Sequence, residues 1–332
     1  IMDIPYWSMI PALTSSKEER EQVAVIPRIF ASTAWLIMGT FGLSIVKKLG
    51  NGNVVKGYSS FAVVIAVTFI ISAIITCLNV KERVETPKNA EKVSFKQTLN
   101  IIRKNDQLLV FIGIVLGMNL IMQISGSMAI YYFTYVVGKE SLFSVYQAFA
   151  GIAEISGLVL LPILTKKIGR EDVFKFGSIL PIAGFLLLFV AGIVAPQNAL
   201  FIGMAGAILK LGSGFLLGST TIMLADVVDY GEFKLGTRNE SIVFSVQTLL
   251  VKGASAVAGW LVGVGLSLVG YVAGEVQSAT TILGMRVIMI WIPIVCAIVM
   301  YTIYKSKYKI NGKFHDDMLV ELEKRKKAND AI

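Results

Sequence analysis

Long apolar stretches separated by short polar segments dominate the chain. Five stretches carry no charged residue at all: 58–80, 107–138, 176–209, 253–274 and 287–304. A helix needs roughly 20 apolar residues to cross the hydrocarbon core of a bilayer, and a helix satisfies its own backbone hydrogen bonds there. The pattern therefore predicts an all-α protein whose helices span a membrane.

The full pattern predicts about nine spans. The run 176–209 is too long for one straight span, and the turn-forming residues at 195–198 divide it into two helices. The predicted spans are about 1–13, 23–46, 58–80, 108–137, 143–165, 174–195, 199–224, 239–270 and 281–304. The chain opens inside an apolar segment without a polar lead-in, so we expect further protein to precede it.

Basic residues alternate between the segments that join these spans. One set of segments, made up of 14–22, 81–107, 166–173, 225–238 and 305–332, holds 22 of the 31 Lys and Arg residues. The segments at the opposite ends of the spans are 47–57, 138–142, 196–198 and 271–280. They hold only Lys47, Lys48, Lys56 and Lys139. Because cytoplasmic loops are the ones rich in Lys and Arg, the first set and the C-terminus are predicted to be cytoplasmic.

The composition supports a membrane protein and argues against other classes. The chain is 55% hydrophobic and 16% charged, whereas soluble domains carry roughly 25% charged residues. The net charge of +9 is explained by the cytoplasmic loops, so no nucleic-acid partner is expected. Cys77, Cys296 and the single histidine, His315, are scattered. They predict no metal site, no disulfide and no Ser-His-Asp set, and hence no enzyme.

The longest polar loop divides the chain into four predicted regions. Spans before it form part of an N-terminal bundle, 1–80, and six spans after it form a C-terminal bundle, 108–304. Within the loop, 81–107, the spacing of Phe95, Leu99 and Ile102 predicts a short amphipathic helix on the inner membrane surface. Residues 305–332 are predicted to be a cytoplasmic tail. If the protein has two six-helix halves, three spans are missing at the front.

Ionisable residues inside spans are costly, which makes them candidates for function. Asp3 and Trp7 are four residues apart and share a helix face. A carboxylate accepts hydrogen bonds from sugar hydroxyls, and an indole offers a flat surface to a sugar ring. Alternatively, Asp3 forms a structural ion pair with Arg28. A guanidinium can bind either a carboxylate or several hydroxyls, so Arg28 fits both interpretations.

A polar stripe marks the span 239–270. Its members are Ser241, Ser245, Thr248, Lys252 and Ser255, with Gln247 beside them. Their spacings of three and four residues put them on one side of a helix. In lipid such a stripe lines a pore or hydrogen-bonds to another helix.

Two further sets of charges have both a structural and a functional interpretation. Glu154 and Lys210 lie in the middle of different spans, where an ion pair between them avoids two isolated charges and a contact with the substrate is the alternative. Five charges fall in predicted inner loops, where they are either solvated or form the ion pairs of an inner gate. These are Arg170, Asp226, Asp229, Glu232 and Arg238.

Several motifs together resemble one transporter family. Residues 1–11, IMDIPYWSMIP, resemble the fourth-helix motif of the glycoside–pentoside–hexuronide:cation symporters, the family of the melibiose permeases. Further matching stretches run in order along the chain, at 27–32, 104–108, 225–232, 240–241 and 245–253. The resemblance covers essentially the whole chain.

The resemblance implies a twelve-helix major facilitator fold, of which this chain would be helices 4–12. It implies symport of a sugar with Na⁺, Li⁺ or H⁺, and a substrate site at Asp3, Trp7, Arg28, Gln247, Thr248 and Lys252. The carboxylates of the family's cation site lie on its second helix, so no cation ligands are expected within this sequence. Glu154 and Lys210 have no charged counterpart in that pattern.

The predicted function is therefore cation-coupled import of a glycoside or oligosaccharide by alternating access. The expected setting is a bacterial inner membrane, with the protein as a monomer and no cofactor beyond the coupling cation. No Walker-type loop indicates an energy source of its own. A membrane glycosyl or acyl transferase and a sugar sensor in a transporter fold are the alternatives.

Overall fold

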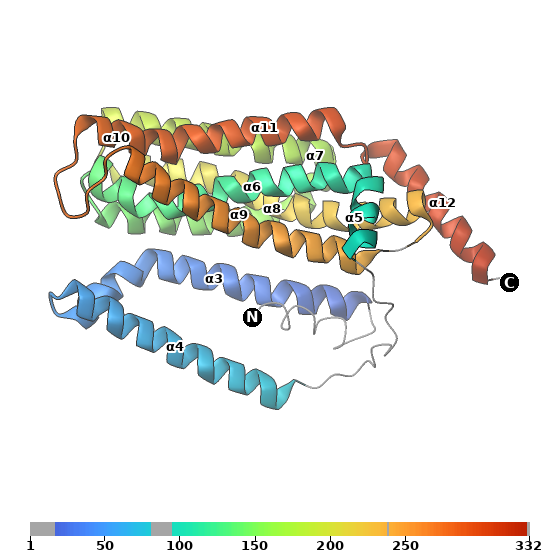
Figure 1. The fold of residues 1–332 in the computed structure, drawn as a ribbon, viewed down its shortest axis with the longest axis horizontal. Helices are drawn as coiled ribbons and strands as arrows, with labels where there is room; N and C mark the ends of the chain where they lie inside the picture. Colours follow the sequence, from blue (N-terminus) through green and yellow to red (C-terminus); the bar gives the residue numbers. More distant parts are fainter. Residues whose placement is uncertain (1–16, 81–94, 238, 331–332) are drawn as a thin grey trace. The chain divides into compact units, whose positions relative to one another are not determined.

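The structure is a computed structural model that describes residues 17–80, 95–237 and 239–330. Every regular element in these ranges is a helix (Figure 1). The chain divides into two compact units, residues 1–92 and 93–332, and each is described by itself. The predicted span 1–13 lies outside the described residues, and with it Asp3 and Trp7.

The described part of the N-terminal unit is a helical hairpin. It consists of α3 (Lys17–Gly50) and α4 (Val54–Asn79). The turn between them uses positive φ angles at Asn51 and Gly52, and the Asn53 side chain caps α4 by accepting a hydrogen bond from the Lys56 amide at 3.0 Å. None of the most apolar window of α4 is buried, as expected for a helix whose surroundings are lipid.

The C-terminal unit contains the remaining helices. They are α5 (Phe95–Lys104), α6 (Asp106–Tyr131), η1 (Tyr132–Val136), α7 (Ser141–Val194), α8 (Ala199–Leu235), α9 (Glu240–Leu268), α10 (Ala279–Arg286), η2 (Val287–Trp291), α11 (Ile292–Lys307) and α12 (Gly312–Asp330). The π-helical segments η1 and η2 continue α6 and lead into α11. Among the described residues, six helices are long and apolar enough to cross a membrane.

One of these six helices contains two predicted spans. Helix α7 has 54 residues, which at 1.5 Å per residue is about 80 Å, roughly twice the thickness of a bilayer. Gly169, with φ 85° and ψ 162°, is non-helical inside it. The chain therefore reverses at one glycine, and the predicted loop 166–173 is wrong except at this residue. A side chain would strain the backbone at this φ.

The predicted inner loop 225–238 is also wrong over most of its length. Helix α8 continues through it to Leu235 and ends at Gly236, whose φ of 72° is typical of a helix C-cap. Asp226, Asp229 and Glu232 are therefore helical, and Asp226 is buried. The sequence misled because an acidic cluster after an apolar run resembles a loop, although nothing in it stops a helix.

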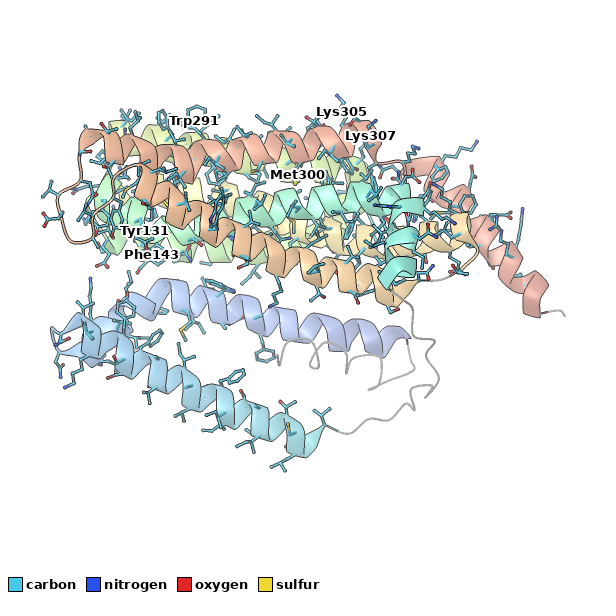
Figure 2. All side chains as sticks on the ribbon, viewed as in Figure 1. Tyr131, Phe143, Trp291, Met300, Lys305 and Lys307 are labelled. Carbon is cyan, nitrogen blue, oxygen red and sulfur yellow. The ribbon has the colours of Figure 1, made fainter. Side chains whose placement is uncertain are left out.

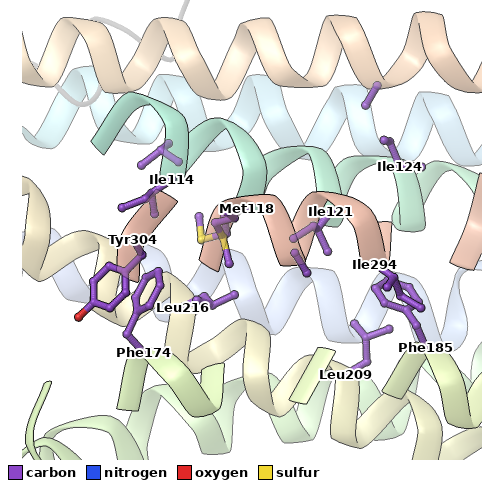
Figure 3. Packing of buried hydrophobic residues seen from close by; sticks show 14 of the residues in the cluster. Ile114, Met118, Ile121, Ile124, Phe174, Phe185, Leu209, Leu216, Ile294 and Tyr304 are labelled. Carbon is purple, nitrogen blue, oxygen red and sulfur yellow. The ribbon is translucent and has the colours of Figure 1, made fainter. Parts of the chain in front are cut away.

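Tight side-chain packing holds the C-terminal unit together (Figure 3). Large buried side chains from four helices meet in its interior, among them Ile114, Met118, Phe174, Phe185, Leu209, Leu216, Ile294 and Tyr304. The rings of Phe174 and Tyr304 stack with centroids 3.9 Å apart. Lipid tails are as apolar as these side chains, so close van der Waals contact stabilises the bundle in place of a hydrophobic effect.

Candidate functional site: polar groups in the bundle and at one end of it

The polar stripe of α9 lies on the outside of the C-terminal unit. Its members Ser241, Ser245, Thr248, Lys252 and Ser255 are exposed, and Gln247 is half-buried. The opposite side of α9, including Val243, Ala254 and Ala258, is buried. The stripe therefore lies away from the buried side of α9, and both interpretations of it, pore lining and contact with another helix, stay predictions.

The N-terminal members of the predicted sugar site are less well defined. Asp3 and Trp7 fall outside the described residues. Arg28 belongs to α3, but its side chain is outside the described part of the structure. The sugar site that includes these residues thus stays a prediction.

The structure brings Glu154 and Lys210 together. Glu154 is on the first half of α7 and Lys210 is on α8, and the ammonium donates to the Glu154 Oε2 at 2.6 Å. The side chains keep 19% and 24% of their surface exposed, respectively. Both side chains are thus mostly buried but remain partly accessible.

A second charged centre surrounds Asp226, near the C-terminal end of α8. The Arg170 guanidinium lies 3.3 Å from its carboxylate, and the Tyr308 hydroxyl donates to it at 3.4 Å. The His315 Nε2 lies 3.3 Å from the other oxygen. Burial, together with the negative charge of Asp226, raises the pKa of Tyr308 well above its ordinary value, so this hydroxyl stays a neutral donor.

A third centre surrounds Asp106 in the first turn of α6. It accepts hydrogen bonds from the Tyr230 hydroxyl at 2.8 Å and from the Lys234 ammonium, and the Lys309 ammonium lies 3.5 Å away. The neighbouring Gln107 side chain donates to the Lys307 carbonyl and accepts from the Lys309 amide. These contacts fasten the segment after α11 to the start of α6.

The segment predicted as a tail holds a docked helix, α12. Met318 and Ile310 are almost fully buried, the Phe314 ring lies against Tyr230 and Phe233, and Arg325 donates to the Phe233 carbonyl at 3.0 Å. The four-residue spacing of these apolar side chains could have indicated the helix. Nothing in the sequence could have linked His315 to Asp226, because 89 positions separate them and only folding brings them together.

The two ends of the C-terminal unit differ in chemistry (Figure 2). Tyr131, Phe143 and Trp291 lie toward one end, and Lys305 and Lys307 lie toward the other. At the first end the hydroxyls of Tyr271 and Tyr135 are 3.1 Å apart, and burial raises the pKa of Tyr271 to about 12. Basic residues gathered at one end of the bundle are typical of one face of a membrane protein.

The other predicted inner charges are only partly described. Asp229 and Glu232 lie in α8 beside Asp226, and Arg238 is outside the described residues. In the described ranges no group of three or more His, Cys, Asp or Glu side chains could hold a metal ion.

These features define a polytopic membrane protein with polar groups within and at the end of a helix bundle, and comparisons with known proteins narrow the class. The family described as "MFS/sugar transport protein" matches residues 1–312. The isoprimeverose transporter of Lactiplantibacillus pentosus is 30% identical over 335 residues, covering 100% of this chain and 68% of that protein. A putative sulfoquinovose importer of Salmonella typhimurium is 30% identical, covering 100% of this chain and 69% of its own length.

The raffinose carrier protein of Pediococcus pentosaceus is 28% identical, and 97% of this chain spans about half, 51%, of that protein. The chain belongs to the MFS/sugar transport protein family. It is thus a multi-pass sugar transporter of the major facilitator superfamily in a bacterial inner membrane, and not an enzyme. The predicted fold class and family are confirmed.

Proposed function

We propose that the protein imports a glycoside or oligosaccharide by symport with Na⁺, Li⁺ or H⁺. The observation that carries this proposal is the polar stripe of α9, whose members Thr248 and Lys252 are exposed on the surface of the C-terminal unit. Relatives whose names refer to isoprimeverose, raffinose and lactose support a glycoside as substrate.

The proposed sugar site joins the two units. Asp3, Trp7 and Arg28 hold the sugar from the N-terminal unit, and Gln247, Thr248 and Lys252 hold it from the C-terminal unit. The two bundles rock about this site, which lies near the midplane of the bilayer, as in other secondary transporters. The coupling cation binds outside the described residues.

The proposed inner gate uses the charges near the cytoplasmic end. Arg170 and Asp226 are 3.3 Å apart, and Asp229, Glu232 and Arg238 extend the same charged region. Ion pairs of this kind are proposed to form and separate as the cytoplasmic end closes and opens. The excess of Lys and Arg in the corresponding loops supports a cytoplasmic C-terminus, and the proposed working unit is a monomer.

Transport by purified protein tests the proposal. The protein expressed from its complete gene is reconstituted in liposomes, and uptake of labelled isoprimeverose, raffinose and lactose is measured with an imposed Na⁺ or H⁺ gradient. We expect one of these sugars to accumulate only when a cation gradient is present. Equal filling without any gradient would overturn cation coupling, and no uptake of any of the three would overturn the proposed substrate class.

The sugar site has its own test. Asp3→Asn should insert normally but weaken equilibrium binding of the transported sugar about 10- to 100-fold, because a hydrogen bond to a charged group contributes roughly 1.5–3 kcal/mol. Trp7→Ala should weaken binding more than Trp7→Phe, which keeps an aromatic surface. Wild-type affinity in Asp3→Asn would show that this carboxylate is structural.

A further inference from the structure

The ion pair between Glu154 and Lys210 has hydrogen-bonding capacity left over. A lysine ammonium has three donors and a carboxylate has about four acceptor positions. In the structure these two groups share one hydrogen bond, of 2.6 Å, and the described residues supply no second one to either group. Polar groups within a membrane bundle are normally satisfied, so the pair is equipped to bind something further.

The pair is not needed to hold its two helices together. Next to it, the backbones of α7 and α8 touch at Gly157 and Gly214. A Cβ on Gly214 would lie 2.5 Å from the Glu154 carbonyl oxygen, and a Cβ on Gly157 would lie 2.7 Å from the Leu211 carbonyl oxygen. Such close contact is itself an effective way to associate helices in lipid. Adding two charges at the same place only adds a desolvation cost, which favours a functional reason for them.

The pair also lies at the depth and on the side where a substrate could reach it. Ser141 and Ala199 begin α7 and α8, and the 269–278 loop lies near the start of α7, since the Tyr271 hydroxyl is 3.1 Å from that of Tyr135. Thirteen and eleven residues of helix place Glu154 and Lys210 about 20 and 17 Å from the starts of their helices. The lengths of α7 and α8 therefore place both groups near the middle of the roughly 30 Å hydrocarbon core.

Glu154 lies on the side of α7 opposite its exposed apolar face. Ile152, Val159 and Ile163 form an exposed apolar face of α7, with 60%, 64% and 49% of their surface accessible. At about 100° per residue, Glu154 lies on the opposite side of the helix. Glu154 thus lies on the side of α7 that contacts α8, away from this apolar face, and keeps 19% of its side-chain surface accessible.

We propose that Glu154 and Lys210 form a second contact site for hydroxyl groups of the transported sugar, on the C-terminal unit. The carboxylate accepts from one sugar hydroxyl and the ammonium donates to a neighbouring sugar oxygen, while the ion pair stays intact. The site would bind a part of the sugar that Thr248 and Lys252 do not hold. This inference rests on the proposed function, because it requires a sugar in the bundle.

Four variants of the complete protein test the inference, with thermal stability in detergent and uptake measured for each. Glu154→Gln and Lys210→Met each strand a charge and should lower both quantities. The double variant Glu154→Gln, Lys210→Gln removes both charges and should melt close to wild type. We expect its KM for the sugar taken up by the wild-type protein to rise about 10- to 100-fold. The exchanged variant Glu154→Lys, Lys210→Glu should likewise recover stability but not KM.

The outcomes separate the inference from its alternatives. A double variant with wild-type stability and wild-type KM would show a purely structural pair and overturn the proposal. If the double variant does not fold, Lys210→Arg decides, because it keeps the ion pair but moves its donors: a raised KM supports contact with the sugar, and an unchanged KM overturns it. Glu323→Gln, in an exposed ion pair of α12, is the control and should change neither quantity. If the wild-type protein takes up none of the three sugars, the proposed function fails instead.

Discussion

Two carboxylates of the same bundle are satisfied in different ways, and the difference indicates what each is for. Within the described ranges Glu154 has one partner, Lys210, at a place where glycines already bring the helices into contact. Asp226 is held by Arg170, Tyr308 and His315, which come from three separate segments. The first group can accept another ligand, whereas the second already has three partners.

Glu154 and Asp226 should also differ in how well they tolerate the loss of a partner. Removing Lys210 leaves Glu154 with no counter-charge among the described residues, and an uncompensated charge in a low-dielectric site is strongly destabilising. Removing one partner of Asp226 leaves two others in place. The partners of Asp226 are therefore redundant, whereas Lys210 is not. Substitution of these residues tests this contrast.

The largest effect on stability is expected at Asp226. Asp226→Asn should lower the free energy of unfolding by about 3 kcal/mol, because an amide at this buried position cannot satisfy Arg170, Tyr308 and His315 together. Denaturant or thermal unfolding of the purified protein measures this. Asp316→Asn, whose carboxylate also lies near His315 but is 80% exposed, is the control and should be near neutral.

The next largest effect is expected from crowding the helix contact beside Glu154. Gly214→Ala would place a methyl group 2.5 Å from the Glu154 carbonyl oxygen, so the helices must separate, at about 2–3 kcal/mol. Gly126→Ala, where nothing lies within 4 Å of the added carbon, should not destabilise. Equal stability of the two variants would show that the close contact of α7 and α8 contributes little.

A smaller effect is expected from breaking the single-partner pair, and it tests the contrast directly. Lys210→Met should cost about 2 kcal/mol, because it leaves the partly buried carboxylate of Glu154 without its counter-charge. Arg170→Gln should cost less, about 1 kcal/mol or below, since Arg170 is half exposed and solvent screens its charge, and Asp226 keeps two partners. The reverse order in parallel unfolding experiments would contradict the proposed redundancy.

A similarly small effect is expected at Tyr308. Tyr308→Phe removes one hydrogen bond of 3.4 Å from Asp226 and should lower stability by about 1 kcal/mol. Tyr301→Phe, on the preceding helix α11, is the matched control. Unfolding curves for the two variants, recorded side by side, should differ by this amount. A loss as large as that of Asp226→Asn would mean that the partners of Asp226 act as one unit.

Much of this protein follows from its sequence, because lipid imposes strict rules on a chain. Stretches free of charge must become helices, so most described spans lie where the apolar runs predict them. A short helix, α5, occupies Phe95–Lys104, where the sequence predicts an amphipathic one. Two lone charges in separate spans need each other in an apolar medium, which explains why Glu154 and Lys210 could be matched from the amino-acid sequence alone.

Other features were decided only by the tertiary structure. The reversal at Gly169 and the continuation of α8 to Leu235 depend on packing between helices, which local composition does not report. The contact of His315 with Asp226 closes a loop of 89 positions, and it exists because Met318 and Phe314 seat α12 against α8. Lipid dictates the spans locally, residue by residue. The cluster around Asp226 instead forms where helix ends that are far apart in sequence meet. The need for apolar helices in lipid does not determine such contacts.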